Sequence, residues 1–244
     1  MPCICSRTPL LQYLGTAASL SLSLSADVSP RARSAAVTAA GSLVKFFIWE
    51  IGYMRSIDII EDRAGWYIIW GVTVWVPSVY TLHTRVLVNL PSGLDWPTAL
   101  LIFAVGIVGV LLNFWTDDER QRFREANGAI EVWGKVPTFI PATYEVLNAE
   151  TGLLETRTTK LLASGWWGVA RHVAYAFELM AAFSWGLLAN PGTHGVLPLF
   201  YPVYLTILLV HRARRDEHKC AAKYGAAYEE YVTKVKWSIV PGLY

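Results

Sequence analysis

The sequence has little charge for its length. Of its 244 residues, 16% are Asp, Glu, Lys or Arg, whereas 54% are hydrophobic and 13% are aromatic. An ordinary soluble domain carries about 25% charged residues, so the composition indicates a protein that lies in a lipid bilayer. The formal net charge is only +2, and no basic patch is interleaved with aromatic residues. These absences exclude the nucleic-acid-binding class.

Cysteine is scarce as well. Cys3, Cys5 and Cys220 form neither a paired framework nor a spacing typical of metal ligands. The few His residues do not cluster either. We therefore expect no disulfide and no metal site.

Long apolar runs dominate what is present. Residues 66–84 and 98–116 are each nineteen residues long, enough to cross about 30 Å of hydrocarbon. Pro77 should kink the first run. The pattern predicts an all-α fold, a polytopic membrane helical bundle. Membrane spans are expected near 45–60, 66–88, 97–116, 175–189 and 196–211.

Residues 1–44 differ from the rest, since they are rich in Ser, Ala and Leu and contain Asp27 as their only acid. The uncharged segment 8–26 suits a short signal sequence, and the acid-poor composition equally suits an organelle transit peptide. An arbitrary, non-homologous start is the third reading, and all three stay open. The membrane domain is expected to occupy residues 45–244.

The segment 117–160 is the one polar excursion between spans. It opens with a charged helix that should end at Asn127 and Gly128. The following residues alternate around the turn NAETG like a small β-hairpin. Near the carboxyl terminus, residues 212–235 should form an amphipathic helix. Basic residues follow two spans an even number of crossings apart, so both clusters and the C-terminus should face the cytosol.

The spacing of several polar residues fits either a binding site or an ordinary structural role. Arg120 and Arg124 stand four apart on one helical face, where they suit either a phosphate or ordinary positive-inside charge. Asp216, Cys220 and Lys223 share a helical stripe that suits either a site or a solvated surface. No base stands beside Cys220 to make it a nucleophile.

Three acids lie in or beside the first apolar helix, namely Glu50, Asp58 and Asp62. A carboxyl held in apolar surroundings has a raised pKa and can donate a proton. Asp58 and Asp62 equally suit an interfacial position.

Taken together, these segments resemble the membrane sterol reductases. The resemblance covers about residues 43–244 and is carried by FFIWEIGYMRSIDIIEDRAGWY, RQRFREANG, GWWGVARHVAY and HRARRDEHKCAAKYGAAYEEY. It implies a multi-pass enzyme of the endoplasmic-reticulum membrane that uses NADPH to reduce the C7–C8 double bond of 5,7-diene sterols. Its expected partners are the sterol substrate, membrane lipid and other sterol-pathway membrane enzymes.

The resemblance also implies roles for individual residues. Asp216 and Arg212 would lie beside the nicotinamide as catalytic residues, with Glu50 as a weaker candidate acid. Glu50, Asp58 and Asp62 would face the sterol. The expected NADPH-binding residues are Arg120, Arg124, Leu162, Trp167, Arg171, Tyr175, Asp216, Cys220, Lys223, Tyr224 and Tyr231.

The chain departs from the family pattern at two positions. Ala174 stands where relatives commonly have Asn or His, which removes one hydrogen bond to the cofactor. Glu61 stands where a His is common. Family members are also about twice this length, so the amino-terminal helices are expected to be absent.

Three rival hypotheses remain. The terminal block shares an Arg-His-x-x-Tyr turn with isoprenylcysteine-type methyltransferases, which would bind S-adenosylmethionine. A truncated paralogue would bind sterol without turnover. A third possibility is reduction of a different sterol double bond, at C14 or in the side chain.

Overall fold

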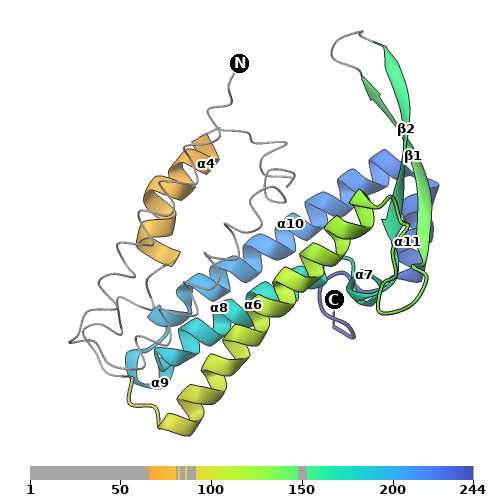
Figure 1. Ribbon diagram of the computed structural model, residues 1–244. Coiled ribbons are helices and arrows are strands. Elements are labelled where there is room, and N and C mark those ends of the chain that lie inside the picture. Colours follow the sequence, from red (N-terminus) through yellow and green to blue (C-terminus); the bar gives the residue numbers. More distant parts are fainter. Residues whose placement is uncertain (1–65, 81, 83–85, 87–91, 148–152, 244) are drawn as a thin grey trace. The chain divides into compact units, whose positions relative to one another are not determined.

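The computed structural model describes residues 66–80, 82, 86, 92–147 and 153–243, drawn in colour in Figure 1. The leader 1–44, the span expected near 45–60 and the three acids Glu50, Asp58 and Asp62 lie outside the described residues. The predictions made for them stay predictions.

The chain divides into two compact units, Met1–Leu111 with Glu178–Thr206 and Leu112–Phe177 with Ile207–Tyr244. Three helices, α6 (Trp96–Glu125), α8 (Val173–Leu188) and α10 (Phe200–Tyr224), contribute residues to both. The described residues are mostly helical, with one two-stranded sheet. The predicted helical fold with a small hairpin therefore holds for this part of the chain.

In the first unit, the run that begins at Trp66 is not one regular helix. It forms α4 (Trp66–Trp70) and continues as a π-helix, η3 (Gly71–Tyr80), which contains Pro77. Proline has no N–H to donate and its ring clashes with the preceding turn, so the helical hydrogen-bond pattern changes around it. The structure thus has a π-helix around Pro77, and the kink expected there stays a prediction.

The expected span near 97–116 lies in α6, a helix of thirty residues. Among the described residues it is the one helix long and apolar enough to cross a membrane. Its apolar side chains, including Leu100, Leu101 and Leu111, are largely exposed, as they would be against lipid. The span near 175–189 corresponds to α8, which has only sixteen residues. The complete polytopic bundle stays a prediction.

The connection between α8 and α10 contains two short helical turns, α9 (Pro191–His194) and η4 (Leu197–Leu199). Trp185 of α8 stacks on Tyr201 of α10, with ring centroids 6.2 Å apart. A side chain at Gly186 would collide with the carbonyl oxygen of Pro198. The small residue therefore allows a close turn between the two helices.

In the second unit, the charged segment after residue 116 continues α6 without a break as far as Glu125. It is not a separate helix, because nothing interrupts the backbone hydrogen bonds at residue 117. The helix ends where predicted: Asn127 and Gly128 have positive φ angles of 49° and 79°, and the amide of Gly128 donates to the carbonyl of Phe123 at 2.8 Å. This is the left-handed end that favours Asn and Gly.

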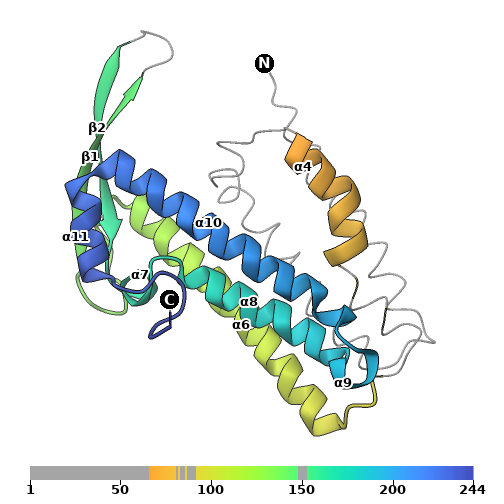
Figure 2. The same cartoon turned by 180° about the vertical axis from the view of Figure 1, so that it is seen from behind.

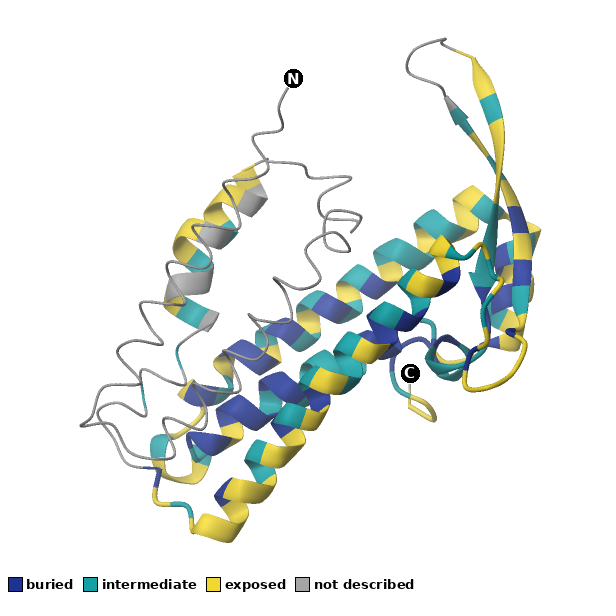
Figure 3. Ribbon diagram, in the orientation of Figure 1, coloured by how far each residue is buried: buried dark blue, intermediate teal, exposed yellow. Residues whose placement is uncertain are grey.

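The predicted hairpin is confirmed. Strands β1 (Phe139–Leu147) and β2 (Leu154–Leu162) pair antiparallel, with Phe139 opposite Leu162. Figure 3 shows buried residues at the base of the hairpin and mainly exposed ones towards its tip. The chain then turns through Gly165 into α7 (Trp166–Val169).

The predicted single helix over 212–235 is wrong in its extent. Helix α10 runs from Phe200 to Tyr224, so the apolar span near 196–211 and the charged segment share one helix. The chain breaks at Gly225, whose φ of 51° is left-handed, a conformation that glycine adopts without strain. Helix α11 (Ala226–Lys234) follows and lies beside the hairpin in Figure 2.

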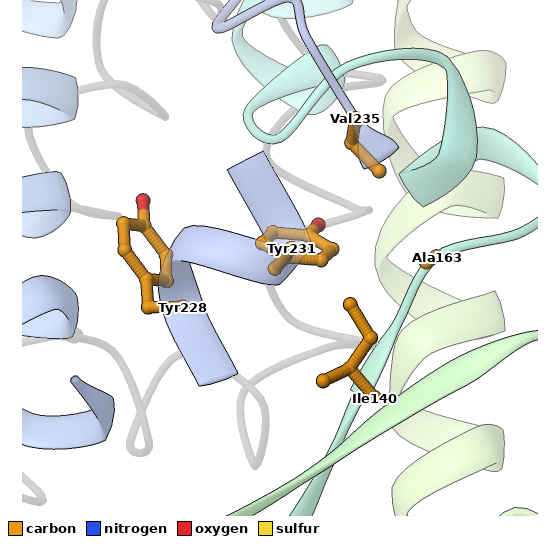
Figure 4. Packing of buried hydrophobic residues seen from close by; sticks show 5 residues of the cluster. All are labelled: Ile140, Ala163, Tyr228, Tyr231 and Val235. Atoms are coloured by element: carbon orange, nitrogen blue, oxygen red, sulfur yellow. The ribbon is translucent and has the colours of Figure 1, made fainter. Parts of the chain in front are cut away.

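The hairpin base and α11 bury a common core. It contains Ile140, Ala163, Tyr228, Tyr231 and Val235. Figure 4 shows the ring of Tyr231 beside Ile140 of β1. This core joins the hairpin to the end of α10 and so determines which side chains surround the polar residues of that helix.

Candidate functional site

Two arginines near the end of α6 lie close to each other and to an aromatic surface. The guanidinium of Arg120 lies 4.0 Å from the ring centroid of Trp167, and the indole of Trp167 is held by a 2.9 Å hydrogen bond to the carbonyl of Thr116. The charge of Arg120, together with burial, lowers the pKa of Arg124 to about 10. Like charges this close indicate a place prepared for an anion.

Ion pairing distinguishes two other arginines of the unit from Arg120 and Arg124. Arg122 pairs with Asp118 at 2.8 Å, and Arg171 pairs with Glu217 at 2.7 Å. Among the described residues, no carboxylate lies within ion-pair distance of Arg120, Arg124 or Lys223. Three of the expected NADPH-binding residues are therefore cations without an acidic partner at ion-pair distance.

The Arg171 side chain, only 9% exposed, ties α10 to the C-terminal tail. Its Nε and Nη2 donate to Oε1 of Glu217 at 3.1 and 2.7 Å, and its Nη1 donates to the carbonyls of Val235 and Lys236 at 2.7 and 2.9 Å. Ser238 Oγ donates to the same Glu217 oxygen at 2.7 Å. Arg171 therefore holds α10 and the tail together, and its expected role at a cofactor site stays a prediction.

Glu217 is ionised in this arrangement. Its partial burial acts to raise the pKa, but the hydrogen bonds from Ser238 and Arg171 and the charge of Arg171 outweigh that effect. The pKa of Glu217 therefore lies below its usual value. The backbone supports the same junction, because the amides of Arg171 and His172 donate to the carbonyls of Trp237 and Ser238.

His172 lies beside the expected catalytic pair. Its side chain is 8% exposed, and its Nε2 lies 4.0 Å from Asp216 and 3.9 Å from Glu217. Burial lowers the pKa of His172, although both carboxylates oppose the shift, so the ring is neutral at pH 7. Its ring stacks on Tyr175 with centroids 5.2 Å apart, and the guanidinium of Arg212 lies 5.9 Å from the Tyr175 ring.

At the far end of α10, the hairpin meets Lys223 and Tyr224. The Lys223 ammonium lies 3.9 Å from the ring centroid of Tyr144 and 5.3 Å from that of Tyr224. The two tyrosine rings meet edge to face at 5.6 Å. One turn earlier, burial raises the pKa of Cys220 to about 12, so its thiol stays protonated.

The remaining predicted residues, Leu162, Trp167 and Tyr231, are buried. Leu162 and Trp167 are buried in one cluster. Tyr231 is 6% exposed, and its hydroxyl donates to the carbonyl of Trp167 at 3.4 Å. Burial raises the pKa of Tyr231 to about 12, so its hydroxyl keeps its proton. Ala174 is buried, and its carbonyl accepts a 2.8 Å hydrogen bond from Asn113.

All the predicted cofactor residues thus belong to one compact unit. Sequence reasoning missed Glu217, Ser238, His172 and Tyr144. Glu217 follows Asp216 directly and falls off the stripe of Asp216, Cys220 and Lys223. The sequence placed Tyr144 on a strand of the hairpin, but a position on a strand does not predict a contact with α10.

Comparison with known proteins gives the class of protein. Residues 43–244 match the model of the Ergosterol biosynthesis ERG4/ERG24 family. Over 202 residues, which are 83% of this chain, it is 45% identical to 7-dehydrocholesterol reductase from Arabidopsis thaliana and 41% identical to the one from Danio rerio. It is also 39% identical to Delta(14)-sterol reductase from Methylotuvimicrobium alcaliphilum.

The chain therefore belongs to the ERG4/ERG24 family of sterol reductases. It spans less than half the length of these relatives: 45%, 41% and 44% of each, in the same order. The family is one of oxidoreductases, which is consistent with a nicotinamide cofactor. Membership leaves the methyltransferase hypothesis without support.

Proposed function

We propose that the chain reduces the C7–C8 double bond of 5,7-diene sterols with NADPH, in the endoplasmic-reticulum membrane and with its C-terminus in the cytosol. The observation that carries the proposal is the set of partnerless cations Arg120, Arg124 and Lys223. They lie in the unit that also contains Asp216, and two of them lie over aromatic rings. Such a set fits a dinucleotide, which presents phosphates and flat rings together.

Each part of the nucleotide has residues that suit it. Arg120 and Arg124 would hold phosphate oxygens, with the ring of Trp167 supporting the Arg120 guanidinium. Arg212 and Asp216 would lie at the nicotinamide, beside Tyr175. The rest of the nucleotide site would be lined by Leu162, Cys220, Tyr224 and Tyr231. The protonated thiol of Cys220 and the protonated hydroxyl of Tyr231 would add no charge to a site that must accept an anion.

The chemistry requires one proton and one hydride. NADPH, when bound, supplies the hydride. A protein acid donates the proton to the alkene, which breaks the π bond and leaves a carbocation for the hydride to meet. Asp216 is the described carboxyl we assign nearest this step, and Glu50 is the second candidate acid. Arg171 and Glu217 fix the helix and tail that position Asp216, which aligns the reacting groups.

The relatives differ in the sterol double bond that they reduce. Two of the relatives named above are 7-dehydrocholesterol reductases and one is a Delta(14)-sterol reductase. Higher identity to the former favours C7–C8, and C14 reduction is the alternative. A sterol-binding paralogue without turnover is the second alternative.

Binding of NADPH tests the site separately from turnover. The full chain would be purified in detergent and titrated with NADPH, following energy transfer from tryptophan to the reduced nicotinamide. Arg124→Ala should weaken binding at least tenfold, because a charge-assisted contact to phosphate contributes about 1.5–3 kcal/mol. Arg122→Ala is the matched control, since Arg122 already pairs with Asp118. Equal affinities of the two variants would refute the site.

Sterol conversion tests the reaction itself. Expression in cells that accumulate 5,7-diene sterols should lower the diene and raise the Δ5 product. A fall in a 14-ene sterol alone would favour the C14 alternative. NADPH binding with an unchanged sterol profile would favour the non-catalytic paralogue.

A further inference from the structure

The hairpin contributes an aromatic residue to the polar end of α10. Tyr144 lies on β1, and its ring touches both Lys223 and Tyr224. The Lys223 ammonium is 3.9 Å from the Tyr144 centroid and 5.3 Å from the Tyr224 centroid, so two aromatic faces define its position. An unsupported lysine ammonium moves on four rotatable bonds.

The cluster remains open to a ligand. Lys223 is exposed, and Tyr144 and Tyr224 are half-buried. No acid among the described residues pairs with Lys223. Contact with a ring uses one side of the ammonium and leaves its other N–H groups able to donate. A fixed, unpaired cation of this kind suits a phosphate.

The position of Lys223 along α10 indicates which phosphate of the cofactor it would meet. Lys223 lies eleven residues after Arg212, which corresponds to about 16 Å along a helix. If the nicotinamide lies at Arg212 and Asp216, a group at Lys223 belongs to the other end of the nucleotide. That end of NADPH carries the 2′-phosphate, which NADH lacks.

We infer that Tyr144 is a positioning residue for cofactor choice: its ring holds the Lys223 ammonium where it meets the 2′-phosphate of the adenosine. This inference rests on the proposed NADPH site and adds the hairpin to it. Tyr144 acts through Lys223, so its effect is confined to ligands that carry the 2′-phosphate.

The test uses fragments of the cofactor on the full chain in detergent. Adenosine 2′,5′-bisphosphate carries the phosphate in question, and adenosine 5′-monophosphate lacks it. Tyr144→Leu keeps an apolar side chain against Tyr224 but removes the aromatic face. It should bind the bisphosphate about two- to fivefold more weakly, the size of one cation–π contact. Its affinity for the monophosphate should match that of wild type.

Two further variants separate this role from a structural one. Tyr144→Phe keeps the ring and should bind both ligands as wild type does. Thr143→Ala, on the opposite face of the same strand, is the control for general damage to the hairpin. In the Lys223→Ala background, adding Tyr144→Leu should weaken bisphosphate binding no further, since the two residues act as a pair.

Three results would overturn the inference. Equal losses for both ligands in Tyr144→Leu would mean that the ring meets the adenine instead. Full affinity in Tyr144→Leu, or additive losses in the double variant, would mean that Tyr144 does not act through Lys223. If wild type binds neither fragment nor NADPH, the proposed function fails first, and this is seen before any variant is made.

Discussion

Removal of the Arg171 charge should be the most destructive single change in the second unit. Arg171→Met leaves the Glu217 carboxylate with Ser238 as its remaining side-chain donor and leaves the carbonyls of Val235 and Lys236 without their partner. Breaking a buried pair costs about 3–5 kcal/mol. Because the Glu217 side chain is 23% exposed, water can hydrate it partly, and we expect the lower end, about 3 kcal/mol.

The assay is urea unfolding of the full chain in detergent, followed by tryptophan fluorescence. The control is Arg157→Met, which removes a partner of the exposed pair Arg157–Glu155. That pair lies at 56% and 43% side-chain exposure, so its loss should cost less than about 0.5 kcal/mol. Arg171→Met combined with Glu217→Met should be less destabilised than Arg171→Met alone, because no unpaired charge remains.

The reasoning is refuted if Arg171→Met unfolds at the same urea concentration as Arg157→Met. A greater loss of stability in the double variant than in Arg171→Met would also contradict the reasoning. The loss would then come from packing and not from a carboxylate left without its partner.

Three smaller predictions concern single residues. The pKa of His172 is lowered in the fold, so as the pH falls the unfolded chain takes up the His172 proton before the folded chain does. The free energy of unfolding should therefore fall as the pH drops below about 6.5. In His172→Phe this dependence of the unfolding free energy on pH should disappear, and an unchanged dependence would mean that another group titrates. Gly165 has a φ of 61°, and a Cβ there would overlap the Glu119 carboxylate and Val132, so Gly165→Ala should lower the free energy of unfolding by about 2 kcal/mol or more. Gly134 also has a positive φ but has open space around it, so Gly134→Ala should lower that free energy by about 1 kcal/mol. Equal losses of the two variants in thermal unfolding would contradict the close approach at Gly165. Cys220, with a pKa of about 12, should react with iodoacetamide at pH 8 on the order of a thousandfold more slowly than a free thiol, as mass spectrometry would measure, and rapid labelling would contradict a protonated thiol.

Local signals predicted the hairpin and the end of α6. Alternation on either side of NAETG is a property of neighbouring residues, and Asn127 and Gly128 tolerate the left-handed backbone that ends a helix. The break at Gly225 carried the same kind of signal, since glycine at φ 51° ends α10. The residues on either side of Gly225 have a strong helical periodicity, and that periodicity led to the prediction of one continuous helix.

Contacts between distant segments were not predictable from periodicity. Glu217 and Arg171 are 46 residues apart, and only the folded chain brings them within 2.7 Å. The stripe of Asp216, Cys220 and Lys223 favoured its own members and excluded Glu217. The resemblance supplied the list of cofactor residues, which includes Arg124 and leaves out Arg122, but it did not predict that Arg122 pairs with Asp118.

Isotope transfer is the most direct test of the central claim that this chain is an NADPH-dependent sterol reductase. Membranes containing the full chain would receive a 5,7-diene sterol and NADPH deuterated at the transferable position of nicotinamide C4. Mass spectrometry of the product should find one deuterium from the cofactor at C7 or C8, and a second hydrogen from solvent when the water is deuterated. Product with no cofactor deuterium, or no product beyond that of membranes without the chain, would contradict the account.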